Sequence, residues 1–295
     1  RNGITSLVFA RSEDGGRTWS PARPIATFGK VTPAENAVFR QGAQVVVLPD
    51  GTLVNAFFRI VFDQVARRVT FEQAVLRSFD QGRHWTRVDT PVASFSSVNA
   101  LDLELGIPVR DAAGLPSIAV DRTTGQIYIA WQDGNANSLG LSGVFVARSD
   151  DSGATWSLPV RVNQGTDDSV QAFLPTVAVN AQGGVGVLFY DFRNDAPGDA
   201  VLSTDVHLSL FGPALNYLGE RRLTPQSFDL RQMVLTGGRG YFPGDYVGLS
   251  SAGNAFVAAF TRSNNLGLPV AFPQNNNGVF VDNNDRQSIV FVRQP

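Results

Sequence analysis

The chain has 295 residues, a formal charge of −2 and a charged fraction of only 17%, with no cysteine and two histidines, His84 and His207. These counts exclude a disulfide framework, a thiolate nucleophile, Cys-ligated zinc and a three-histidine zinc site. The near-neutral balance argues against nucleic acid as a partner, and no apolar run approaches the ~18 residues that would span a bilayer, so we expect neither nucleic-acid binding nor membrane insertion.

An eight-residue pattern, Ser-x-Asp-x-Gly-x-(Thr/His)-Trp, occurs three times, at 12–19, 78–85 and 149–156. An Asp side chain can accept hydrogen bonds from N–H groups two or three residues further on, and glycine permits the positive φ of a tight turn. The Trp would then start the next strand and bury its ring against the hairpin. We therefore interpret these Asp residues as turn-stabilising groups and not as catalytic ones.

A second repeated unit is a strand, a turn and a strand, found at 43–59, 116–133, 175–193 and 247–262. These hairpins are apolar on both faces, which is typical of a sheet that is covered on both sides. No stretch shows a capped helical period. The sequence therefore predicts an all-β fold in which inner hairpins alternate with the outer hairpins that carry the Trp motif.

Two hairpins together make four antiparallel strands, and a radial repeat of such units is a β-propeller. We therefore predict a single propeller domain, 1–295, with parts of at least five blades. Since a propeller must close to avoid exposed edges, either sequence upstream of this chain is missing, which we favour, or the N-terminal strands complete the last blade. In chain order the predicted units are an outer hairpin at 4–27, complete blades at 40–95, 100–165 and 170–225, an inner hairpin at 245–262 and a further strand at 288–293.

The three Trp motifs resemble the Asp-box, or bacterial neuraminidase, repeat, and the chain as a whole is similar to a sialidase-type propeller. The resemblance implies six blades, Asp boxes on the face opposite the active site, and a bacterial protein that is secreted, periplasmic or on the cell surface. It further implies hydrolysis of a terminal glycosidic bond of an acidic sugar. Asp-box propellers also include non-enzymatic receptors and lyases, so a glycan- or protein-binding propeller and a polysaccharide lyase stay open.

Three arginines are predicted to bind the substrate carboxylate, because the guanidinium fork matches a carboxylate in a bidentate manner. Arg193 and Arg262 lie near the ends of second strands of inner hairpins. Arg40 stands where a sialidase carries a Phe-Arg-Ile-Pro segment, although Gln-Gly replaces Ile-Pro here. We predict that the three side chains point into one central pocket. The alternative is that each caps a strand end or pairs with a neighbouring Asp.

The resemblance also implies catalytic roles. A sialidase uses a Tyr nucleophile, because an anomeric carbon that bears a carboxylate repels a carboxylate nucleophile. Tyr246 matches that Tyr in position, and Tyr241 is the second candidate. Asp63 matches the acid/base Asp, which protonates the leaving oxygen and later activates water. Among the five glutamates, elimination selects Glu104 as the group that takes the phenol proton.

One further segment is relevant to cofactors. The polar stretch 275–285 carries several Asn and Asp residues, whose oxygen atoms could bind a structural Ca²⁺ ion. It does not follow the EF-hand spacing, and a plain surface loop is the alternative. We expect no other cofactor and no catalytic metal, and a carbohydrate as the partner.

Overall fold

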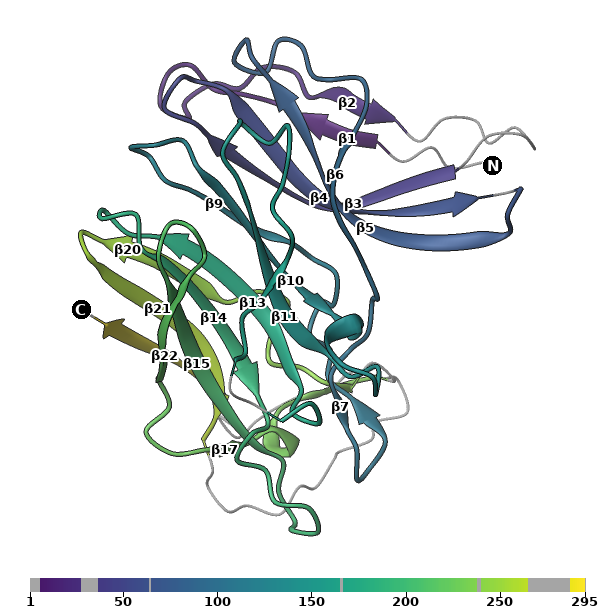
Figure 1. Cartoon of the computed structure of the whole chain (residues 1–295), viewed down its shortest axis with the longest axis vertical. Helices are drawn as coiled ribbons and strands as arrows, with labels where there is room; N and C mark the ends of the chain where they lie inside the picture. Colours follow the sequence, from purple (N-terminus) through teal and green to yellow (C-terminus); the bar gives the residue numbers. More distant parts are fainter. Residues whose placement is uncertain are drawn as a thin grey trace. The chain divides into compact units, whose positions relative to one another are not determined.

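The computed structural model describes residues 6–27, 37–63, 65–164, 167–237, 240–264 and 287–294 (Figure 1). Strand accounts for 50% and helix for 2%, and the described helices are two short 3-10 turns, η1 (Gly134–Ala136) and η2 (Leu230–Gln232). The prediction of an all-β fold is therefore confirmed. Within the described residues we find no helix with the length and apolar character needed to cross a membrane.

The contacts within the chain divide it into two compact units. Unit 1 comprises residues 1–96, 115–129 and 147–159, and unit 2 comprises residues 97–114, 130–146 and 160–295. We describe each unit by itself. The single propeller domain, the closure of its ring and the number of its blades stay predictions.

Unit 1 contains a hairpin and a four-stranded antiparallel sheet in the order β3-β4-β5-β6. Its central strand β4 is buried on both faces over 53–58, as its mostly apolar sequence, which only Asn55 interrupts, predicts. Phe57 of β4 and Leu76 of β5 form a small core with Leu7, Ala26 and Trp85 packed against it, so the hairpin rests on this sheet. The strands are β1 (Ser6–Phe9), β2 (Arg23–Thr27), β3 (Ala37–Val47), β4 (Leu53–Asp63), β5 (Arg68–Ser78) and β6 (Thr90–Phe95).

The next predicted blade contains a second four-stranded sheet in the order β12-β11-β10-β9, whose residues are divided between the two units. Every residue of its strand β10 is buried, which again matches an apolar sequence without alternation. The strands are β9 (Ser117–Val120), β10 (Ile127–Asp133), β11 (Gly143–Ser149) and β12 (Val160–Arg161).

Unit 2 is built around the antiparallel sheet β13-β14-β15-β16, with β17 paired to β15, and the three-stranded sheet β20-β21-β22 (Figure 1). Between them lies a large apolar core that includes Phe173, Tyr190, Phe228 and Phe260. The strands are β13 (Ala172–Val179), β14 (Val185–Asp191), β15 (Ser203–Phe211), β16 (Tyr217–Arg222), β17 (Phe228–Asp229), β20 (Gly248–Ala252), β21 (Ala255–Ser263) and β22 (Gln287–Gln294).

Two short hairpins complete unit 2 and carry residues of the candidate site. They are β7 (Leu101–Asp102) with β8 (Ile107–Pro108), and β18 (Leu235–Thr236) with β19 (Gly240–Tyr241). A Cβ atom on Gly240, which has φ +96°, would lie 1.6 Å from the carbonyl oxygen of Pro108. Only glycine permits both this backbone conformation and this close approach of the hairpins.

The three Trp motifs fold into the same hydrogen-bonded turn. In the third copy the Ser149 hydroxyl accepts from Gly153 N at 2.9 Å and donates to Asp151, which in turn accepts from the Thr155 amide and hydroxyl at 2.8 and 2.6 Å. The copies at 12–19 and 78–85 repeat these contacts. The Asp residues are therefore turn-stabilising groups, as predicted.

The tryptophans of the motif differ from the prediction in two ways. None of them starts the next strand, because Trp19 and Trp156 lie four residues before it and Trp85 lies five residues before it, and Trp19 is 65% exposed. Trp85, by contrast, is half-buried and packs edge-on against Phe9 at 5.2 Å between ring centroids. Trp19 lies in the connection between β1 and β2, which form a two-stranded sheet among the described residues. A two-stranded sheet offers less surface to cover an indole ring than a four-stranded sheet does.

Candidate active site

The predicted site residues are distributed over both units. Arg40 and Asp63 lie in unit 1, whereas Glu104, Arg193, Tyr246 and Arg262 lie in unit 2. The convergence of all three arginines in one pocket therefore stays a prediction. The predicted Ca²⁺ segment 275–285 lies outside the described residues, and within the described part of the chain no cluster of three or more Asp, Glu or His side chains is arranged to hold a metal ion.

Arg40 lies within β3, directly opposite Arg59 of β4. Both side chains bind the carboxylate of Asp89, Arg40 through Nε and Nη2 at 3.0 and 2.7 Å and Arg59 through Nη1 at 3.1 Å. Arg59 also donates to Glu72 at 2.7 Å. Two arginines and two carboxylates thus neutralise each other, which matches the pairing alternative of the sequence analysis.

Asp63 is the last residue of β4. Its Oδ1 accepts hydrogen bonds from the backbone N–H groups of Val65 and Ala66, at 3.0 and 2.8 Å. This is the local contact pattern of an Asx turn, in which the side chain replaces a backbone acceptor. Its role as a catalytic acid stays a prediction.

Arg193 follows β14 and is likewise paired. It donates to the buried Asp191 at 2.6 Å and to Glu220 at 2.5 Å. Burial raises the pKa of Asp191 to about 6, although the hydrogen bonds and charge of Arg193 oppose the shift. Arg262 of β21 differs, because its Nε atom is buried and has no hydrogen-bond partner among the described residues.

The two predicted tyrosines occupy opposite environments. Tyr246 lies between β19 and β20 and is 67% exposed. Tyr241 is buried in β19, where its hydroxyl contacts Asp102 Oδ2 at 3.3 Å. Burial raises the pKa of Tyr241, and the negative charge of Asp102 adds to the shift, so this phenol is held in its protonated form.

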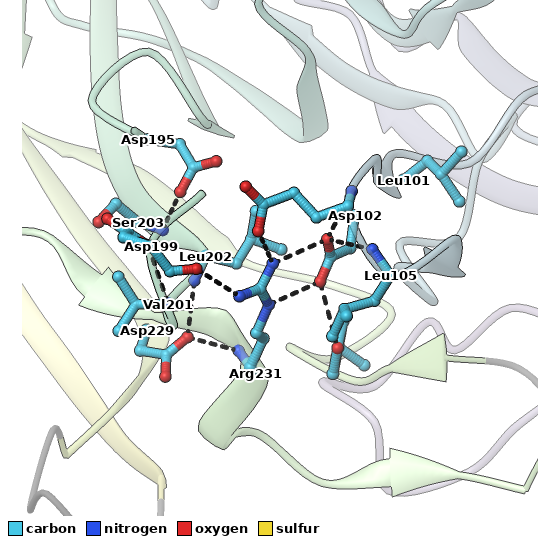
Figure 2. A network of polar contacts seen from close by, with 12 residues as sticks. Leu101, Asp102, Leu105, Asp195, Asp199, Val201, Leu202, Ser203, Asp229 and Arg231 are labelled. Atoms are coloured by element: carbon cyan, nitrogen blue, oxygen red, sulfur yellow. Dashed lines mark hydrogen bonds and ion pairs between the residues drawn. The ribbon is translucent and has the colours of Figure 1, made fainter. Parts of the chain in front are cut away.

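Glu104 is part of a charged network that we call the Arg231 cluster, formed by Asp102, Glu104 and Arg231. Arg231 binds the fully buried Asp102 through Nε at 2.8 Å and Nη2 at 3.0 Å, and the same Nη2 donates to Glu104 Oε2 at 2.8 Å. Figure 2 shows the guanidinium group between Asp102 on one side and Asp195, Asp199 and Asp229 on the other. The carboxylate of Glu104 remains partly exposed, with 28% of its side-chain surface accessible.

Local backbone contacts hold this cluster in place. Asp102 ends β7, and its Oδ1 also accepts from the N–H groups of Glu104 and Leu105. Arg231 lies in η2, whose N-cap residue Asp229 accepts from the Arg231 N–H at 3.0 Å. The β7 hairpin is tied to the start of β13, because Leu101 and Gln171 exchange two hydrogen bonds of 2.9 and 2.7 Å.

The loop at 192–202, which follows β14, completes the site. The Gly198 N–H donates to Glu104 Oε1, and the Asp199 carbonyl accepts from Arg231. Asp195 lies in the same loop, half-buried, and accepts from Ser203 N–H at 2.7 Å (Figure 2). The loop therefore brings Asp195 into the electrostatic range of Glu104.

The carboxyl groups of Glu104 and Asp195 are shifted in opposite directions. The hydrogen bonds from Arg231 and from Gly198 N–H lower the pKa of Glu104. Burial raises the pKa of Asp195, and the negative charges of Asp199 and Glu104 raise it further. Two neighbouring carboxyl groups whose pKa values are pushed apart are suited to act as a base or nucleophile and as an acid.

Sequence reasoning found one member of this site and missed the others. Glu104 was selected by elimination, but its partners Arg231 and Asp102 lie outside any motif. Asp195 stands only two residues after Arg193, in the sequence Asp-Phe-Arg-Asn-Asp. The position of Asp195, a second acidic residue just beyond a strand end, could have been used to predict it as a site residue. Nothing in the sequence around Arg231 distinguishes that residue as part of a site.

No family model matches the sequence, and no curated protein matches it. Among solved structures the chain is similar to an α-L-arabinanase from Penicillium chrysogenum complexed with arabinobiose, with 17% identity and a TM-score of 0.51 over 85% of this chain and 66% of that one. It is also similar to an α-L-arabinofuranosidase from Fusarium graminearum complexed with an iminosugar inhibitor, with 15% identity and a TM-score of 0.50 over 97% and 84% of the two chains.

Sialidases are also among the similar structures. A Hadza microbial sialidase has 17% identity and a TM-score of 0.46, over 75% of this chain and 42% of that one. This chain thus spans just under two thirds of the length of the arabinanase and less than half of that of the sialidase. The similarities to the arabinanase and the arabinofuranosidase show an all-β fold that this chain shares with these two glycosidases.

Proposed function

We propose that the protein is a glycoside hydrolase that cleaves a terminal glycosidic bond, with Asp195 as the acid and Glu104 as the base or nucleophile. The observation that carries the proposal is the geometry of the site: Arg231 and Gly198 N–H hold Glu104, and the same loop holds the half-buried Asp195. Burial raises the pKa of Asp195, and the hydrogen bonds from Arg231 and Gly198 lower that of Glu104. Most glycosidases act through two carboxyl groups of this kind. The fold of the neighbouring arabinanase and arabinofuranosidase supports the same class of enzyme.

The proposed chemistry uses both carboxyl groups. Asp195 gives its proton to the glycosidic oxygen while the bond from that oxygen to the anomeric carbon breaks. Glu104 either attacks the anomeric carbon itself or removes a proton from the water that does so. Arg231 and Asp102 do not contact the reacting atoms in this scheme. They position Glu104 and keep it ionised, because the bidentate pair fixes the guanidinium group that binds it.

The charges around the site favour a neutral sugar. The carboxylates of Asp102 and Glu104 both bind the guanidinium group of Arg231, and the negative charges of Asp199 and Glu104 act on Asp195. A negative surrounding of this kind repels an anionic substrate. Since two structural neighbours are named for arabinan-type activities, arabinose-containing glycans are the first class to test.

A sialidase-type reaction on an acidic sugar is the second candidate. Arg262 favours it, because its buried Nε atom has no hydrogen-bond partner among the described residues and could bind a substrate carboxylate. In this candidate Tyr246 is the nucleophile, and Arg40 and Arg193 must release Asp89 and Asp191 or bind the substrate beside them.

The experiment compares hydrolysis of 4-nitrophenyl α-L-arabinofuranoside, linear arabinan and a 4-methylumbelliferyl sialoside. We expect turnover of the neutral substrates, and a loss of kcat of about 10²–10⁴-fold in Glu104→Gln and in Asp195→Asn. Asp167→Asn is the matched control, because Asp167 is an exposed loop residue of unit 2 that accepts a hydrogen bond from Ser169 N–H; it should retain full activity.

Four outcomes overturn the proposal. Turnover of the sialoside alone, abolished in Tyr246→Phe, establishes the sialidase candidate. Turnover of a neutral substrate that survives in both carboxyl variants removes Glu104 and Asp195 from catalysis. Glycan binding without hydrolysis of any substrate leaves a binding protein, and elimination of a uronic polymer with formation of a double bond establishes a lyase.

A further inference from the structure

Beside the Arg231 cluster, unit 2 presents a second group of polar and aromatic side chains. Arg110 binds Asp245 through Nε at 3.2 Å and Nη2 at 2.9 Å, and its guanidinium carbon lies 4.3 Å from the centroid of the Phe242 ring. About one third of both charged side chains is exposed. The next residue, Tyr246, has two thirds of its surface exposed.

We propose that Tyr246, Arg110 and Asp245 form a subsite that binds a sugar residue of a neutral glycan next to the carboxyl pair. The substrate identity rests on the proposed function, but the binding does not require catalysis. An exposed tyrosine ring offers an apolar face on which the C–H groups of a sugar ring can pack, and the paired charged side chains offer hydrogen-bonding atoms for its hydroxyl groups. Such a combination of an apolar surface with a few fixed polar groups is typical of small-molecule sites.

The hydrogen-bonding capacity of the pair is only partly used. Arginine carries five N–H donors, and the bonds to Asp245 use two of them. Each carboxylate oxygen of Asp245 accepts one of these bonds and retains a lone pair. A sugar hydroxyl is both a donor and an acceptor, so it can bind both partners. Because Arg110 and Asp245 neutralise each other, the pair favours an uncharged ligand.

Tyr241 connects this subsite to the Arg231 cluster. Its carbonyl oxygen accepts from Arg110 N–H at 2.8 Å, while its hydroxyl contacts Asp102. Tyr241 therefore contacts one residue of each group within unit 2. A ligand of several sugar residues that reaches Glu104 is thus expected to extend towards Tyr246.

Other exposed aromatic residues lack this setting. Phe79, for example, is 65% exposed and lies 5.5 Å from the guanidinium carbon of Arg77, but it belongs to a repeat turn of unit 1 and has no carboxylate partner in that contact. Phe79→Ala is therefore a matched control, because it removes an equally exposed aromatic ring that stacks on an arginine.

The experiment measures binding by isothermal titration with arabinotriose, and in separate arms with xylotriose and 3′-sialyllactose. The Glu104→Gln chain is used as the background, so that hydrolysis does not consume the probe. We expect a neutral trisaccharide to bind, and its Kd to increase about 2- to 10-fold in Tyr246→Ala, since an aromatic contact is worth roughly 0.5–1.5 kcal/mol. Tyr246→Phe retains the ring and should bind as tightly as the background. Arg110→Met should weaken binding by a similar factor, and Phe79→Ala should not change the Kd.

The result separates this inference from the proposed function. Tyr246-dependent binding of a neutral trisaccharide supports the subsite even if no hydrolysis is found, in which case only the proposed function fails. An unchanged Kd in both Tyr246→Ala and Arg110→Met overturns the subsite, as does binding of 3′-sialyllactose alone. Loss of binding in Tyr246→Phe equal to that in Tyr246→Ala also overturns it, because the phenol and not the ring would then be the recognised group.

Discussion

The repeat turns and the Arg231 cluster both depend on carboxylates that accept several hydrogen bonds. The hydrogen-bond donors are close in sequence in the turns and far apart in sequence in the cluster. In each turn the Asp binds residues within four positions of it. In the cluster, Arg231 binds residues 129 and 127 positions away. The turn forms wherever its eight residues occur, whereas the cluster exists only once the β7 hairpin and η2 have packed together.

Burial separates the two regions as well. The turn carboxylates face solvent, and their pKa values fall because nearby donors bind them; for Asp14 the hydrogen bonds from Thr18 and Ser12 lower the pKa to about 2. For Asp102, burial is the largest single influence and acts to raise the pKa, but the hydrogen bonds and charge of Arg231, together with the N–H groups of Leu105 and Glu104, outweigh it and the pKa is lowered. The cluster therefore depends on a single cation, and this dependence can be tested.

The largest effect is expected for Arg231→Met. The change leaves the fully buried Asp102 without its counterion, which typically costs about 3–5 kcal/mol of unfolding free energy. Urea unfolding measures the loss. Arg148→Met is the control, because its partner Asp150 is mostly exposed, and such surface pairs contribute about 0–1 kcal/mol. Equal losses in the two variants would contradict the distinction between buried and exposed pairs.

A second prediction concerns pH and the buried His207. Burial lowers its pKa to about 3, and the positive charge of Arg193 contributes, whereas an unfolded histidine titrates near ~6.5. The unfolded chain therefore takes up the proton first, and stability falls as pH drops from about 6.5 towards 3. Over that pH window, His207 lowers the free energy of unfolding by up to about 1.4 kcal/mol for each pH unit of acidification. Unfolding of wild type and His207→Gln at pH 7, 6 and 5 should show that the variant lacks this loss.

Asp111 is expected to show the opposite sign. Burial raises its pKa to about 6, against opposing hydrogen bonds from Ala100 N–H, Gln132 and Asn99, while an unfolded Asp titrates near ~3.9. Here the folded chain binds the proton first, so the contribution of Asp111 to stability grows as pH drops from about 6 to 4. Asp111→Asn should remove that gain in the same unfolding series. If both variants changed the pH dependence in the same direction, the assignment of one of the two shifts would be wrong.

The smallest effect tests the turns themselves. Ser149 and Gly153 are buried, so Ser149→Ala leaves the Gly153 N–H without its acceptor and should cost roughly 1–2 kcal/mol. Ser12 makes the same bond to Gly16 in an exposed turn, where water can replace it. A loss in Ser12→Ala as large as that in Ser149→Ala would show that burial does not set the contribution of the motif.

Much of the fold was predictable from the sequence because its signals are local. The unbroken apolar run of β10, the turn glycines and the three Trp motifs each specify a strand or a turn without reference to distant residues. Two of the three predicted four-stranded units contain a four-stranded sheet, and in the third β17 adds a fifth strand to the four. The burial of Trp19 was predicted wrongly, because the motif specifies the turn but not the number of strands beside it.

The candidate site was predictable only in part. Glu104 was identified, but as a partner of a tyrosine; in the structure it binds Arg231, and Tyr241 contacts Asp102 instead. Arg40 was assigned to a substrate carboxylate and is found paired with Asp89. The sequence shows where charged residues occur. It does not show which of them pair with each other in the folded chain.

The sequence by itself determined where strands and turns occur, since alternation, apolar runs and Asp–Gly turn chemistry act over a few residues. Only the tertiary structure decided which charges neutralise each other and which carboxyl group keeps its proton. Those properties depend on the burial of each group and on which segments meet around it, and in the Arg231 cluster both arise from contacts between residues more than a hundred positions apart.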